Sequence, residues 1–163
     1  ASDFTLDNCY FGVSAGTNAF SSAVLDILSA DRVSVENNVF FINNALAEAS
    51  SVYGIRVLDS NDLAIEGNSF YGAYTSAVVS DAGPTLESNG IRIIGNDIAN
   101  VFNGSTASAI DLNSPAEGLI AYNNIYMAGG NATQASFFDN ASAGLVENYA
   151  TTASTRAAII LIP

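Results

Sequence analysis

A six-residue pattern recurs six times along this chain of 163 residues, and this repeat restricts the fold more than any other feature. An apolar residue usually opens the pattern, Asn or Gly usually stands third, Asn fourth and a second apolar residue sixth. Successive copies begin 24 to 30 residues apart, a period typical of solenoids and repeat arrays. The copies are LDNCYF, VENNVF, IEGNSF, IIGNDI, AYNNIY and LVENYA, which begin at Leu6, Val35, Ile65, Ile93, Ala121 and Leu145.

Apolar and intervening residues alternate around each copy with the two-residue period of a β-strand. The residue two positions before each copy is also apolar, so we expect this residue and the first residue of the copy to point inward. In the fifth copy this places Leu119 inside and Ile120 outside. Asn or Gly, which tolerate the left-handed backbone of a corner, are third in five copies, and a second short strand follows. A polar loop and a third apolar stretch complete each repeat, at 23–29, 53–60, 76–83, 108–114, 135–142 and 157–163.

Each repeat therefore returns the chain beside its own start, which predicts an all-β fold. We expect one domain, a right-handed single-stranded parallel β-helix of about six coils with three parallel sheets and no capping helix. A β-sandwich is the alternative, whereas Gly, Asn and Ser interrupt every candidate helix. The expected coils span residues 1–30, 31–60, 61–88, 89–114, 115–142 and 143–163.

Equivalent residues of stacked coils lie about 4.8 Å apart, so the fourth residues are predicted to form a row inside the corner. Asparagine amides there can pass hydrogen bonds from coil to coil and satisfy polar groups at the bend. This structural ladder is predicted to contain Cys9, Asn38, Asn68, Asn96, Asn124 and Asn148. The sixth residues are predicted to form a core stack of Phe11, Phe40, Phe70, Ile98 and Tyr126.

The second residue of each copy faces outward and is acidic in the first three copies, as Asp7, Glu36 and Glu66. Carboxylates about 5 Å apart repel one another unless solvent, a cation or a base offsets their charge. Arg92 is predicted to lie diagonally beside Glu66. These residues could bind Ca²⁺ and act on an acidic sugar, or supply a glycosidase pair. The favoured interpretation is a solvated polar face with one surface ion pair.

The charged residues and missing residue types exclude several function classes. The chain has sixteen acidic residues, four arginines and no lysine, which gives a net charge of −12. We therefore expect no nucleic-acid or anionic-membrane partner. The absence of histidine excludes Ser-His-Asp and Cys-His catalysis and imidazole metal sites. We therefore assign no catalytic or metal-binding residue and expect no cofactor.

Both ends of the chain are expected to be strands with nothing to cover them. Because solenoids need caps, we expect each end to meet another protein surface, either within a longer polypeptide or in an assembly.

The Asn-x-Phe, Asn-x-Ile and Asn-x-Tyr segments at 38–40, 68–70, 96–98 and 124–126 resemble corners of the pectate-lyase-like right-handed β-helix superfamily. The stacked asparagine corners and short Ala/Ser/Gly-rich coils are similar to β-helix regions of virion structural proteins from marine tailed phages. The resemblance to pectate lyases implies acidic Ca²⁺ ligands and a basic residue on the first sheet. Only Asp7, Glu36, Glu66 and Arg92 match those roles, and the family's further lysine and arginine contacts are absent.

The resemblance implies a non-enzymatic module on the surface of a phage particle, a decoration, fibre or spike component that acts through protein–protein docking. Expected partners are other virion subunits, including copies of the chain itself, with a trimer as the typical assembly. The alternative is a carbohydrate-active module that binds or cleaves extracellular polysaccharide through Asp7, Glu36, Glu66 and Arg92. A bacterial surface or secreted adhesin is the third, less favoured interpretation.

Overall fold

The computed structural model describes residues 3–13, 23–42, 53–72, 76–80, 88–100, 108–112, 116–127, 138–139, 142–146 and 149–152. Within these ranges every regular element is a β-strand, and all strands pair in parallel. The expected third stretch at 157–163 and the ladder position Asn148 lie outside the described residues.

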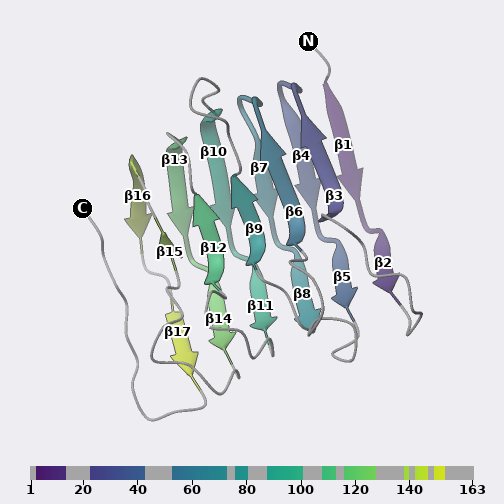
Figure 1. Cartoon of the computed structure of the whole chain (residues 1–163), viewed down its shortest axis with the longest axis vertical. Coiled ribbons are helices and arrows are strands. Elements are labelled where there is room, and N and C mark those ends of the chain that lie inside the picture. The colour runs from purple at the N-terminus through teal and green to yellow at the C-terminus, as the bar shows by residue number, and fades with distance from the viewer. Residues whose placement is uncertain are drawn as a thin grey trace.

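The strands form three sheets, each of which runs along the molecule, and in the view of Figure 1 the second sheet lies below the other two. The first sheet contains β1 (Phe4–Asp7), β4 (Val33–Glu36), β7 (Ala64–Glu66), β10 (Ser88–Ile94), β13 (Ala116–Ala121) and β16 (Ser142–Val146). The second contains β2 (Tyr10–Val13), β5 (Val39–Ile42), β8 (Ser69–Gly72), β11 (Asp97–Asn100), β14 (Asn124–Met127) and β17 (Tyr149–Thr152). The third contains β3 (Ala23–Leu28), β6 (Tyr53–Leu58), β9 (Ser76–Ser80), β12 (Ser108–Leu112) and β15 (Phe138–Asp139).

The chain visits the three sheets in turn and then starts again beside its previous strand. Each strand therefore pairs with the strand three places further along, as β1 does with β4 and β4 with β7. This confirms the predicted all-β fold with three parallel sheets, as in a parallel β-helix. Three successive strands, one from each sheet, are called a coil below, and β1 to β3 form the first coil.

The core consists of rows of equivalent side chains that point inward from successive coils. Val35, Ile65 and Ile93 form one such row and are fully buried. The rings of Phe11, Phe40 and Phe70 form another, stacked with centroids 4.9 Å apart at each step. Burying one side chain of this size contributes about 1.5–3 kcal/mol, so these rows are a main source of stability.

The predicted register of the fifth copy was wrong by one residue. Ile93 pairs with Ile120 rather than with Ala121, so the equivalent segment is IAYNNI and Ile120 is buried. Leu119, predicted inside, pairs with the outward-facing Arg92 instead. In the core stack Ile125, which is fully buried, follows Ile98, whereas Tyr126 is 43% exposed.

The cause of this error lies in the corner residue, the third of the pattern. Asn8, Asn37, Gly67 and Gly95 all have left-handed φ angles of 53° to 64°, as predicted, but the fifth corner residue is Tyr122, at φ 56°. A left-handed residue with a side chain costs roughly 1–2 kcal/mol. Burying two isoleucines contributes about 1.5–3 kcal/mol each, which outweighs that cost.

Replacing this strained tyrosine should stabilise the protein. Tyr122 is 58% exposed, so Tyr122→Asn removes little buried surface and installs the residue found at the first two corners. We expect the free energy of unfolding in urea to rise by up to about 1 kcal/mol. As the control, Tyr126→Asn removes a strand tyrosine and should not stabilise. A Tyr122→Asn variant no more stable than wild type would contradict the strain argument.

Candidate functional site

The corner between the first and second sheets contains a buried row of asparagines. Asn38, Asn68, Asn96 and Asn123 are at most 1% exposed, and we call them the asparagine ladder. The backbone N–H of each of the first three donates to the Oδ1 of the next asparagine at 2.9 Å, and its Nδ2 donates to the same atom at 2.9–3.1 Å. The Oδ1 atoms of Asn68, Asn96 and Asn123 thus each accept two hydrogen bonds from the preceding coil.

The ladder amides also bond to the main chain at the end of the first-sheet strands. Their Nδ2 atoms donate over 2.8–2.9 Å to the carbonyl oxygens of Leu6, Val35, Ile65 and Ile93. Every ladder side chain therefore satisfies backbone groups of the coil before it, at a bend where strand pairing is interrupted. Because the donors and acceptors are used within the protein, the ladder is a structural element rather than a ligand site.

The first member of the predicted row, Cys9, ends the ladder. Its backbone N–H donates to Asn38 Oδ1 at 2.9 Å, and its thiol donates to the Asp7 carbonyl oxygen at 3.4 Å. The Cys9 thiol thus bonds within its own coil, whereas each ladder asparagine bonds to the coil before it.

The predicted ladder position in the fifth copy, Asn124, was wrong. Asn123 occupies the ladder, whereas Asn124 is exposed and donates to Asp97 Oδ1 at 2.8 Å. Two consecutive asparagines satisfy the sequence pattern equally well, so the pattern alone could not distinguish them.

A second polar row, which the sequence analysis missed, lies at the corner between the third and first sheets. Asn61 Nδ2 donates to Asp31 Oδ1 at 3.0 Å, and the backbone N–H of Asn89 donates to Asn61 Oδ1 at 3.2 Å. The sequence contained a signal for this row, because Asp31, Asn61 and Asn89 each stand two positions before an inward-pointing apolar residue. These apolar residues are Val33, Leu63 and Ile91.

The acidic row of Asp7, Glu36 and Glu66 occupies equivalent positions on β1, β4 and β7, as predicted. Each carboxylate accepts a hydrogen bond from a neighbour. Asp7 accepts from Asn8 at 2.7 Å and Asn37 at 3.1 Å, and Glu36 accepts from Ser34. Glu66 pairs with Arg92 at 3.1 Å, which confirms their predicted proximity.

The described arginines all join neighbouring coils through ion pairs with an acid of the preceding coil. Arg32 pairs with Asp3, Arg56 with Asp26 at 2.7 Å, and Arg92 with Glu66. The hydrogen bond and the charge of Asp3 raise the pKa of Arg32 above its ordinary value. Ion pairs at such solvent-accessible positions are weak, so they support the stacking rather than cause it.

The chemistry available on this face is limited by these pairings. Among the residues that the structure describes, no group of three or more His, Cys, Asp or Glu side chains could hold a metal ion. The acidic row is balanced by amides, a hydroxyl and a guanidinium along the outer face of a sheet. This arrangement matches the polar-face interpretation of Asp7, Glu36, Glu66 and Arg92.

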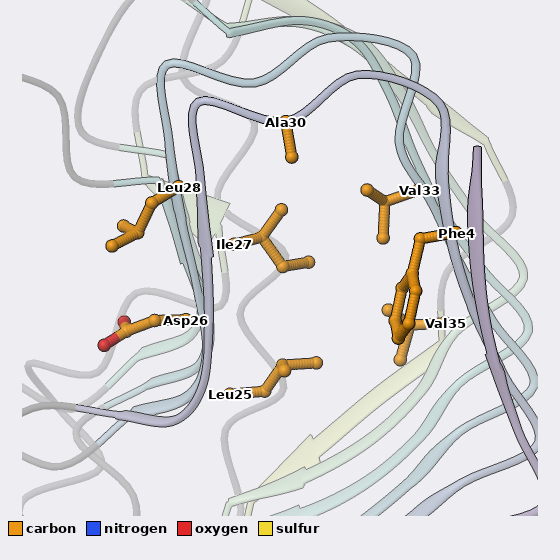
Figure 2. Close-up of a pocket in the computed structure, with 8 residues that line it drawn as sticks. All are labelled: Phe4, Leu25, Asp26, Ile27, Leu28, Ala30, Val33 and Val35. Carbon is orange, nitrogen blue, oxygen red and sulfur yellow. The ribbon is translucent and has the colours of Figure 1, made fainter. Parts of the chain in front are cut away.

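An apolar cavity of about 280 Å³ lies inside the first coil (Figure 2). Leu25 and Ile27 of β3 point into it from one side and Phe4, Val33 and Val35 from the other. Asp26 and Leu28 point away from it. Phe4 is 51% exposed although it borders the same cavity as the buried Val35.

The two adjacent asparagines allow a matched test of the ladder. Asn123→Ala removes the acceptor for two donors of Asn96 and a donor to the Ile93 carbonyl. Each orphaned buried group costs about 1–3 kcal/mol, so we expect a loss of at least about 2 kcal/mol in urea unfolding. Asn124→Ala removes an exposed amide and should change stability by about 0.5 kcal/mol or less. Equal effects of the two substitutions would contradict the assigned register.

The described residues include no helix long and apolar enough to cross a membrane. Comparison of the chain with protein-family models, with curated proteins and with solved structures finds no match.

Proposed function

We propose that this chain is a non-enzymatic structural and interaction module that docks to another protein subunit at the apolar cavity of its first coil. The apolar cavity bordered by Phe4, Leu25, Ile27, Val33 and Val35 is the observation that carries this proposal. Exposed apolar surface next to a packed core favours burial against a partner.

The strands of the first coil border this cavity and, within the described ranges, pair with the second coil on one side. A partner strand that paired along their other side would gain backbone hydrogen bonds and cover the cavity.

The occupant that we propose is a second copy of the chain. Two copies related by a two-fold axis would present identical first-coil strands to one another, so one contact would pair both sets of strands. The resemblance of the asparagine corners to phage β-helices supports the surface of a phage particle as the setting. There the chain would serve as a decoration, fibre or spike component beside other virion subunits. The pairing of every acid of the acidic row with a neighbouring donor supports a non-catalytic role.

A charge placed at the cavity rim should prevent this docking. Phe4 is half-exposed, so Phe4→Asp leaves the buried rows in place but would bury an unpaired carboxylate in the interface. We expect sedimentation velocity to show a concentration-dependent dimer for wild type and a monomer for Phe4→Asp.

Tyr126→Asp is the matched control, because Tyr126 is similarly exposed at 43% but lies on β14, four coils away from the cavity. This variant should dimerise like wild type. A wild-type protein that stays monomeric at every concentration, or a Phe4→Asp variant that dimerises normally, would contradict the proposal.

A further inference from the structure

The strand pair β10 and β13 contains two registers. Asn89 pairs with Glu117, 28 residues further along the chain, whereas Ile91 pairs with Gly118, 27 residues further. The register therefore shifts at Gly90, for which the fifth coil has no equivalent residue. The chain thus enters β13 with one residue fewer at the corner between the third and first sheets than it has on entering β10.

This corner contains one left-handed residue at each of three earlier passages of the chain. Arg32, Asp62 and Gly90 have φ angles of 55°, 55° and 70°, and a buried apolar residue follows each of them. The fifth coil offers the same two residue types, Gly118 followed by Leu119. In the observed register, however, both lie one position past these places, so that the glycine stands at the apolar position and the leucine faces outward.

The observed register of the fifth coil combines good burial with poor backbone geometry. A Cβ atom at Gly118 would lie 1.9 Å from the carbonyl oxygen of Ile91, so the main chains approach closely there. At the other end of β13, Tyr122 is left-handed without being Gly or Asn. The same register buries Ile120 and Ile125 completely. Burial therefore favours the observed register, whereas backbone geometry favours one displaced by a residue.

We propose that the fifth coil is a two-state element in which β13 and β14 also adopt this displaced register. In the displaced register Gly118 occupies the left-handed corner before β13. Asn123 takes the left-handed corner after it, and Asn124 enters the asparagine ladder. The strain at Tyr122 is released. Because side chains alternate along a strand, the displacement also turns the exposed Tyr126 into the core.

The exchange of registers changes the side chains that the fifth coil presents to a partner. Ile120 and Ile125 turn outward, whereas Leu119 and Tyr126 turn inward and recover much of the lost apolar burial. Two states that differ by so little give a minor population of about 0.1–10%. The element lies four coils away from the cavity of the first coil, so it goes beyond the proposed docking and does not depend on it.

The two consecutive asparagines again provide a matched test, here by NMR on isotope-labelled protein. Asn123→Gly removes the ladder residue of the observed register, but in the displaced register it places Gly at a corner where Gly67 and Gly95 already stand, and Asn124 completes the ladder. We expect this variant to show a scalar coupling from the backbone nitrogen of Asn96 to the side-chain carbonyl carbon of Asn124. The ring of Tyr126 should lose the relaxation enhancement that a soluble paramagnetic probe produces in wild type.

Asn124→Gly is the control, because it removes an exposed amide and leaves Asn123 in the ladder. This variant should keep the coupling from Asn96 to Asn123 and the accessible ring of Tyr126.

Gly118→Asn tests the other corner independently of the ladder. Its side chain collides with the Ile91 carbonyl in the observed register, whereas asparagine tolerates the left-handed corner of the displaced one. We expect the same new coupling to Asn124 and the same protection of Tyr126. The proposal is overturned if either Asn123→Gly or Gly118→Asn keeps the ring of Tyr126 accessible. Failure of either variant to fold also overturns it, because the displaced register gives both a complete ladder.

Discussion

The structure depends on side-chain amides that take the place of main-chain partners at one bend. Strands in a coil stack satisfy their own N–H and C=O groups, but the left-handed corner between the first and second sheets interrupts this pairing. Asn38, Asn68, Asn96 and Asn123 supply the missing donors and acceptors, each toward the coil before it. Without them, several buried polar groups per coil would lose their partners in a low-dielectric interior, where such losses are costly.

Because the ladder sets the register of each coil, it also determines which side chains align on the outer faces. The same alignment brings Arg92 to Glu66 on the first sheet and Phe41 to Tyr71 on the second. A solenoid therefore turns small sequence choices at equivalent positions into extended rows.

The sequence was sufficient for the three sheets, because alternation, corner asparagines and a constant period all indicate the same coil. It was insufficient in the fifth copy, where Ile120 and Ala121, and likewise Asn123 and Asn124, fit the pattern in either register. There the preference for asparagine at the left-handed corner was misleading, since burial of Ile120 and Ile125 outweighs the strain at Tyr122. The position of the Tyr10 ring over Gly12 was not predictable either, because alternation does not encode this contact.

The most direct test of the asparagine ladder is NMR detection of scalar couplings across its hydrogen bonds in isotope-labelled protein. The account predicts correlations from the backbone nitrogens of Asn38, Asn68 and Asn96 to the side-chain carbonyl carbons of Asn68, Asn96 and Asn123. Correlations of these nitrogens to main-chain carbonyls of antiparallel neighbours, or to the side chain of Asn124 in place of Asn123, would contradict it.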